Sequence, residues 1–204
     1  MPATLYHVHD PMCSWCWGFR RSWDALRTSL PEAVTVVNVV GGLAPDSDEP
    51  MPHEQREAIA SYWAKIGEEV GAEFNLDFWS QCEPRRSTYP ACRAVIAASF
   101  QSQEQGMIDA IQHAYYLRAM NPSDISTLLQ LAEELGLDRG QFSDDLGSEH
   151  TEQEMQRHFA LRRHLNVYSF PSLVLETDSG LHPVLHDYHS ATSSLEIIKA
   201  LIQP

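Results

Sequence analysis

The 204-residue sequence has no long apolar run and no cluster of basic residues, and each absence argues against a class of function. No window approaches the roughly 18 consecutive apolar residues that a membrane span requires. Lysine and arginine together number 14 against 28 acidic residues, which makes the net charge −14. An acidic surface repels nucleic acid and anionic membranes. We therefore expect a soluble protein with no nucleic-acid or membrane partner.

The N-terminal residues also lack the features of a secretory signal peptide. Such a peptide has a basic start followed by an apolar stretch of about 7–15 residues, and residues 1–13 contain neither. The chain has four cysteines, too few for a secreted disulfide scaffold. We therefore expect a cytoplasmic protein whose thiols are normally reduced. The length predicts one domain, or one domain with a large insertion.

The first forty residues alternate between strand and helix patterns. Residues 4–9 (TLYHVH) have the period of a short strand, which Pro11 ends. Large apolar residues then recur every three or four positions over residues 14–30, which predicts an amphipathic helix. Residues 34–40 (VTVVNVV) are apolar enough for a strand buried on both faces of a parallel sheet. Together these patterns predict a strand–helix–strand unit.

A loop rich in proline and aspartate follows at residues 44–50, and the apolar period then stays helical until about residue 165. A capping box of Thr151 and Glu154 predicts the start of one of these helices. The apolar stripes of the others are formed by Ile59, Trp63, Ile66 and Val70; by Val95 and Ala98; by Met107, Ile111 and Ala114; and by Ile125, Leu128, Leu129, Ala132 and Leu135.

Strand character returns near the C-terminus. Ser172–Glu176 and Pro183–His186 predict two strands, and the six residues between them suit a hairpin loop. Ser193 and Glu196 predict the cap of a last helix, Leu195–Ile202.

The predicted fold is therefore α/β, in the order β-α-β, an all-helical insertion, then β-β-α. The two ends of the chain are expected to form one sheet. We place one domain at residues 1–44 and 166–204, and the helical insertion domain at residues 45–165.

Two of the cysteines, Cys13 and Cys16, form a Cys-x-x-Cys pair at the predicted strand-to-helix junction. A helix N-terminus stabilises negative charge through its free N–H groups and its dipole, and cysteine reacts as the thiolate. Cys13 precedes the first turn and Cys16 lies one turn deeper, so we expect an exposed attacking Cys13 and a shielded resolving Cys16. Such a pair beside a strand–helix–strand pattern is typical of a thioredoxin-like redox protein.

Two other interpretations of the pair remain open: buried structural thiols, and a metal or cluster site shared across a dimer. A zinc site needs four ligands at short spacings, whereas Cys82 and Cys92 have nine residues between them. His7 and His9 share one strand face and are further candidate ligands. We expect no metal and no organic cofactor. We interpret Cys82 and Cys92 as free thiols, with a second redox pair as the alternative.

The sequence Ser169-Phe170-Pro171-Ser172 directly precedes a predicted strand. We expect Pro171 to be cis and to face the cysteine pair, which frees the Phe170 backbone to pair with an extended substrate segment. The alternative is a proline that only starts a strand. Trp15, between the cysteines, is our candidate for a substrate surface. We expect Asp10 to form the turn before the cysteines; a proton relay or a raised thiol pKa is its alternative role.

Three segments resemble the DsbA-like branch of the thioredoxin superfamily, and in particular its cytoplasmic group of predicted protein-disulfide isomerases. They are DPMCSWCWGF (10–19), STYPACRAV (87–95) and YSFPSLVLE (168–176). The resemblance covers essentially the whole chain and implies a thioredoxin-like fold interrupted by an all-helical domain. It implies a thiol–disulfide oxidoreductase in which Cys13 is the nucleophile, Cys16 resolves the mixed disulfide and Pro171 is the cis-proline. Its partners would be protein or small-molecule thiols and disulfides, glutathione among them as a co-substrate. No oligomeric state follows from the sequence.

The sequence departs from this family's pattern at two places. Ser14 and Trp15 replace the Pro-His dipeptide of the strongly oxidising periplasmic members, so the resemblance does not imply a comparably high potential. Ser169 replaces a glycine that is common two residues before the cis-proline. Hydroxychromene-carboxylate isomerases and kappa-class glutathione transferases share the architecture and usually carry serine where Cys13 stands. A glutathione-dependent enzyme of that kind, acting on a small molecule, is the alternative function.

Overall fold

The computed structural model describes residues 2–203. Its sheet has four strands in the order β2-β1-β3-β4. The strands are β1 (Ala3–His9), β2 (Val34–Val40), β3 (Ser172–Thr177) and β4 (Gly180–Val184). β1 pairs in parallel with β2 and antiparallel with β3, which pairs antiparallel with β4. The two ends of the chain therefore form one sheet, which confirms the predicted α/β class.

Helix α1 connects the two parallel strands, seven helices lie between β2 and β3 in the sequence, and α9 follows the sheet. Among residues 2–203 no helix combines the length and the apolar composition of a membrane span. The helices are α1 (Ser14–Ser29), α2 (His53–Val70), α3 (Phe78–Gln81), α4 (Tyr89–Ser99), α5 (Glu104–Leu117), α6 (Ile125–Glu134), α7 (Arg139–Leu146), α8 (Glu149–His164) and α9 (Thr192–Ile202).

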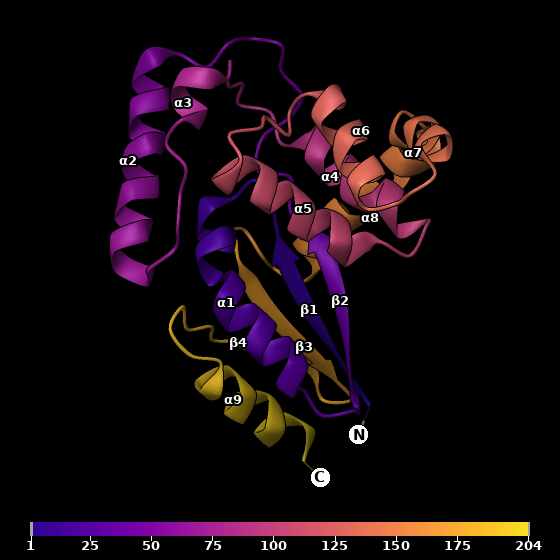
Figure 1. The fold of residues 1–204 in the computed structure, drawn as a ribbon. Helices are drawn as coiled ribbons and strands as arrows, with labels where there is room; N and C mark the ends of the chain where they lie inside the picture. The colour runs from indigo at the N-terminus through magenta and orange to yellow at the C-terminus, as the bar shows by residue number, and fades with distance from the viewer. Residues whose placement is uncertain (1, 204) are drawn as a thin grey trace.

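The strands are covered on both faces because their side chains alternate between two apolar clusters. In β1 and β3, odd-numbered residues such as Leu5 and Leu173 pack with Phe19 of α1 and Ile198 of α9. The even-numbered residues of these two strands pack in a second cluster with residues of α8 and of the segment that follows it: Val8, Val174, Leu161, Leu165 and Val167. β1 and β2 run from the end of the molecule where both termini lie toward helices α2–α8, so α1 begins beside those helices (Figure 1).

The helical region shares its core with the segment that carries the cysteine pair. Met12, Trp17 and Val40 belong to the same buried cluster as Trp63 of α2 and Tyr116 of α5. The Trp17 ring stacks on Tyr116 with 5.4 Å between the ring centroids. The first turn of α1 is therefore anchored in the core formed by the helical region. The domain boundaries at residues 45 and 165 stay predictions.

Two predicted helix caps are wrong. α8 begins at Glu149, and its N-cap is Ser148, whose hydroxyl accepts a hydrogen bond from the Thr151 backbone N–H at 3.1 Å. Thr151 itself is buried inside the first turn. α9 begins at Thr192 after Ala191, which makes no side-chain cap, so Ser193 and Glu196 lie inside that helix. Several neighbouring Ser, Thr and Glu residues satisfy the capping pattern, and the packing of the helix decides at which of them the helix begins.

The second C-terminal strand also begins earlier than predicted. β4 starts at Gly180, which pairs with Thr177, so two residues form the hairpin loop instead of six. Gly180 has φ +122°, a backbone conformation that a residue without a Cβ adopts easily. Pro183 pairs with Val174 on this edge strand, where the missing N–H faces away from the sheet.

Candidate active site

The cysteine pair lies where β1 turns into α1. The backbone N–H of Cys13 donates to the Asp10 carbonyl at 3.0 Å, which closes the turn, and the Trp17 N–H donates to the Cys13 carbonyl at 3.0 Å, which opens the helix. Cys13 is the N-cap residue, with extended backbone angles and no hydrogen bond from its own side chain to the cap. Its sulfur is thereby placed beside the free N–H groups of the first helical turn.

The two thiols have opposite pKa shifts. A hydrogen bond from the Cys16 thiol, together with the backbone N–H groups of Cys16 and Trp15, lowers the pKa of Cys13 despite its burial. Burial, and then the interaction with Cys13, raises the pKa of Cys16 well above its ordinary value. Both cysteines are free thiols in this structure. The thiolate therefore forms more readily on Cys13 than on Cys16.

Cys13 is less exposed than the sequence predicts. The residue is 8% exposed and Cys16 is 3% exposed. Both side chains are therefore buried, and the prediction that Cys13 is exposed is wrong. Cys13 is covered because the segment before β3 folds over it. It nevertheless lines a cleft of about 560 Å³ that Cys16 does not line.

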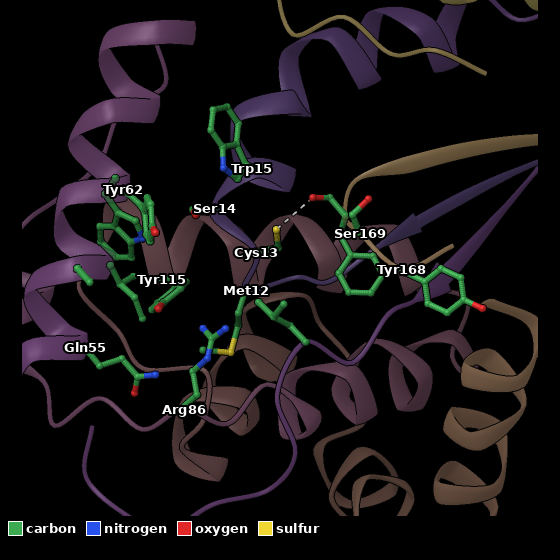
Figure 2. Close-up of a pocket in the computed structure, with 15 residues that line it drawn as sticks. Met12, Cys13, Ser14, Trp15, Gln55, Tyr62, Arg86, Tyr115, Tyr168 and Ser169 are labelled. Atoms are coloured by element: carbon green, nitrogen blue, oxygen red, sulfur yellow. Dashed lines mark hydrogen bonds between the residues drawn. The ribbon is translucent and has the colours of Figure 1, made fainter. Parts of the chain in front are cut away.

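The covering segment is the predicted proline turn, and the Phe170–Pro171 peptide bond is cis, as expected. The Cys13 thiol points at the Phe170 carbonyl oxygen, with 3.7 Å between sulfur and oxygen (Figure 2). Residues separated by more than 150 positions in the sequence thus meet at the sulfur. This contact confirms that the turn faces the cysteine pair.

The Phe170 ring is held by the end of β2. A Cβ atom built at Gly41 would lie 2.2 Å from the ring, so only glycine leaves room for it. The Arg162 guanidinium lies over the ring at 5.7 Å and donates a hydrogen bond to the Gly41 carbonyl at 2.8 Å. The ring is therefore held between Gly41 and Arg162, and the Phe170 carbonyl faces the thiol.

Asp10 supports the turn from behind. Its carboxylate is fully buried and accepts hydrogen bonds from the Met12 N–H (2.9 Å), the Leu43 N–H (2.7 Å) and the Thr88 hydroxyl (2.8 Å). The bond to Met12 confirms the predicted turn-forming role. Burial raises the pKa of Asp10, and its charge acts to raise the pKa of Cys13. Asp10 therefore joins the cysteine turn to the segment after β2 and to the residue that precedes α4.

The remaining cysteines have separate partners. Cys92 is fully buried, and its thiol lies 3.7 Å from the Asp10 carboxylate. The Cys82 thiol donates to the Ala119 carbonyl at 3.0 Å. Both are free thiols in this structure. His7 and His9 stack on each other at 4.8 Å. Within residues 2–203 no group of three or more His, Cys, Asp or Glu side chains is placed to hold a metal ion.

The cleft at Cys13 has a volume of about 560 Å³ and lies between α2 and the proline turn (Figure 2). Trp15, the predicted substrate contact, forms part of its wall. No pattern in the sequence predicts Tyr62, Arg86 or Tyr168 as part of the site, although the last two lie next to or within the quoted motifs. The lining residues are Met12, Cys13, Ser14, Trp15, Leu43, Gln55, Ala58, Ile59, Tyr62, Trp63, Arg86, Tyr115, Tyr168, Ser169 and Phe170.

Known proteins share this sequence pattern over most of the chain. A family model described as thioredoxin matches residues 6–191. The ClpXP adapter protein SpxH of Bacillus subtilis is 25% identical over 187 residues, which cover 88% of this chain and 62% of that protein. SpxH of Halalkalibacterium halodurans is 24% identical, with 87% and 60% covered. The chain thus spans about three fifths of the length of these curated relatives.

Solved structures share the fold over the whole chain. A candidate protein disulfide isomerase from Nitrosomonas europaea superposes with a TM-score of 0.85 at 25% identity, covering 100% of this chain and 98% of that one. The cytosolic disulfide reductase DsbM from Pseudomonas aeruginosa superposes with a TM-score of 0.80 at 22% identity, covering 98% of each chain. DsbM has also been solved with GSH. The protein is therefore a member of the thioredoxin family with the fold of the DsbA-like oxidoreductases.

Proposed function

We propose that the protein is a thiol–disulfide oxidoreductase that acts through Cys13 and Cys16. One observation carries this proposal: a thiol with a lowered pKa stands at the start of α1, lines a cleft, and has a second thiol one turn behind it. Low pKa and access are the properties of a reactive cysteine. Trp15 and the Phe170 backbone are the proposed substrate contacts, and Pro171 shapes the turn that carries the second of them.

The proposed reaction transfers two electrons. The Cys13 thiolate attacks one sulfur of a substrate disulfide, a bond forms between Cys13 and that sulfur, and the other substrate sulfur leaves as a thiolate. Cys16 then loses its proton and attacks the Cys13 sulfur. This step forms the Cys13–Cys16 disulfide and releases the second substrate thiolate. The reverse sequence oxidises two substrate thiols, and disulfide isomerisation combines both directions on one substrate.

Trapping of the mixed disulfide tests this proposal. In Cys16→Ser the second step is blocked, so adducts between Cys13 and cell proteins or small thiols should accumulate and turnover in insulin reduction should fall by about 100-fold or more. Cys82→Ser is the matched control, and it should turn over like the wild type. Non-reducing gels and mass spectrometry measure the adducts. Iodoacetamide should label Cys13 before Cys16 at neutral pH; faster labelling of Cys16 would reverse the assigned roles.

A glutathione-dependent enzyme that acts on a small molecule is the second candidate. The cleft volume of about 560 Å³ lies within the range of small-molecule sites, and the structural neighbour DsbM was solved with GSH. This function would need a bound glutathione thiol and not Cys16. Cys16→Ser should therefore keep glutathione transfer or isomerase activity if the second candidate is correct.

The cytoplasm is the proposed compartment, which the similarity in fold to the cytosolic reductase DsbM supports.

A further inference from the structure

Apart from the Cys13 thiolate, the cleft at Cys13 contains a single charge. Among residues 2–203, Arg86 is the only charged residue that lines it; the others are aromatic, aliphatic, sulfur-containing or neutral polar residues. Figure 2 shows the guanidinium turned into the cleft beside the Met12 side chain. Burial raises the pKa of Tyr115, which lines the same cleft, and the charge of Arg86 partly opposes this shift. The electrostatic character of the cleft is therefore set by one cation.

Arg86 has no anionic partner of its own. Within the part of the chain that the structure describes, the Arg86 side chain takes part in no hydrogen bond and no ion pair, and the residue is exposed. Its neighbour Arg85 pairs with Asp124 at 2.5 Å, and Arg93 binds both Asp46 at 2.6 Å and Glu152 at 2.9 Å. Arg86 lacks a carboxylate partner although the chain has 28 acidic residues and only 14 basic ones. Its guanidinium is therefore available to bind a carboxylate of a ligand.

The charge of the rest of the molecule makes this arrangement specific. A protein with a net charge of −14 and a thiolate nucleophile repels anionic disulfides and attracts cationic ones. The cation Arg86 opposes the repulsion of anionic disulfides at the place where the disulfide must bind. A planar guanidinium also binds a carboxylate through two hydrogen bonds.

We propose that Arg86 selects low-molecular-weight disulfides that carry a carboxylate close to the sulfur–sulfur bond. The inference deepens and depends on the proposed thiol–disulfide exchange at Cys13. The ligand carboxylate binds the Arg86 guanidinium, its carbon chain lies against the aromatic walls, and its sulfur meets Cys13. The cleft volume of about 560 Å³ favours a small molecule over an extended peptide. Arg86 is a binding residue in this scheme and exchanges no proton or electron.

Three disulfides of similar size and different charge test the proposal. Dithiodipropionate is dianionic, bis(2-hydroxyethyl) disulfide is neutral and cystamine is dicationic. The fully reduced protein is mixed with each at low salt, and formation of the Cys13–Cys16 disulfide is followed by acid quench and mass spectrometry. The readout is the ratio of the anionic to the neutral rate within one variant, because this ratio cancels any effect of Arg86 on the Cys13 thiolate.

The wild type should react faster with the anionic probe than with the neutral one, and slowest with the cationic one. Arg86→Gln should lower the anionic-to-neutral ratio by about three- to tenfold, and Arg86→Glu should lower it further, as expected for loss of one partly exposed charge pair. Arg21→Gln removes an exposed charge on α1 outside the cleft and should keep the wild-type ratio. Added salt should reduce the preference, since the pair is exposed.

Other results would overturn the inference. A wild type that reacts fastest with cystamine, or an Arg86→Gln variant with an unchanged ratio, would show that Arg86 does not select the substrate while leaving the proposed thiol exchange intact. A charge preference seen only with a cystine-linked acidic peptide would assign the cleft to a peptide instead. Failure of all probes to oxidise the pair would overturn the proposed function and this inference together.

Discussion

At the scale of single residues, the thiols of Cys13 and Cys16 have different pKa values because they have different surroundings, although they are only three residues apart. Cys13 precedes the first turn and receives N–H groups that have no partner within the helix. Cys16 is enclosed and gives its hydrogen bond to Cys13. One thiol is thereby prepared as the nucleophile and the other stays protonated until the first has reacted. The asymmetry requires no charged side chain.

The charge of Asp10 opposes the lowering of the Cys13 pKa. Asp10→Asn removes the negative charge that helps to raise the pKa of Cys13, so this pKa should fall further below its ordinary value. The amide group also turns an N–H₂ toward donors such as the Leu43 N–H. A buried donor left without an acceptor costs about 1–3 kcal/mol of stability.

Two measurements check the Asp10→Asn prediction. Thiolate absorbance at 240 nm against pH gives the pKa of Cys13, and urea unfolding gives the stability. Asp178→Asn, on the exposed hairpin loop, should change neither quantity. A higher Cys13 pKa in Asp10→Asn, or an unchanged one with full stability, would contradict the electrostatic role assigned to Asp10.

At the scale of elements, the end of β2 positions the proline turn. Gly41 follows the last residue of β2, and the Phe170 ring occupies the space where a side chain at Gly41 would stand. Arg162 of α8 lies over the Phe170 ring and donates a hydrogen bond to the Gly41 carbonyl. The end of β2, α8 and the proline turn thus meet at the Phe170 ring. The distance between the Cys13 sulfur and the Phe170 carbonyl therefore depends on how Gly41 and Arg162 pack against this ring.

Gly41→Ala tests this dependence. The added methyl group would displace the Phe170 ring, which should cost about 1–3 kcal/mol of stability through overpacking. The turn should move with the ring, and the rate of exchange with bis(2-hydroxyethyl) disulfide should fall by about tenfold or more. Gly147→Ala is the matched control, because its Cβ would meet no atom within 4 Å. Equal rates in the two variants would show that Phe170 does not position the turn.

At the scale of the whole molecule, the sheet carries buried histidines beneath α1. His7 lies between Trp23, at 4.0 Å, and His9, at 4.8 Å. Burial, only partly offset by the hydrogen bond to Asn38, lowers the pKa of His7 to about 4. Burial, together with the charges of His7 and His158, lowers the pKa of His9 well below its ordinary value. Both rings are neutral in the folded protein at neutral pH.

These histidines predict a loss of stability in mild acid. The unfolded chain binds a proton at each histidine near pH 6.5, whereas folded His7 binds one only near pH 4. The folded state therefore binds fewer protons in this window, and its stability falls as the pH falls. The loss for His7 alone is about 2 kcal/mol between pH 7 and pH 5. Asp10 and Glu104 act in the opposite direction, since burial raises their pKa values.

Urea unfolding followed by tryptophan fluorescence at pH 7 and pH 5 measures this loss. His7→Gln should reduce the difference between the two pH values, although the variant is less stable overall because the stack on Trp23 is lost. His53→Gln, on the exposed start of α2, should keep the wild-type difference. A difference between the two pH values that is as large in His7→Gln as in the wild type would contradict the assigned protonation state of His7.

The sequence by itself determined the features that depend on neighbouring residues. The runs at residues 4–9, 14–30 and 34–40 became β1, α1 and β2 within about one residue, because strand and helix periods are local patterns. The position of the cysteine pair at the start of α1 follows from those runs. The cis bond at Pro171 was also predicted, since it belongs to a local motif beside a strand.

Only the tertiary structure decided which distant groups meet. Asp10 gained Leu43, Thr88 and Cys92 as neighbours, and Arg86 joined Cys13 in one cleft, through contacts that no periodicity encodes. Packing also selected Ser148 as the cap of α8 and buried Cys13 beneath the proline turn. Local patterns specify the elements because backbone hydrogen bonds span a few residues. The site is specified by how those elements pack, because its side chains come from segments far apart in the chain.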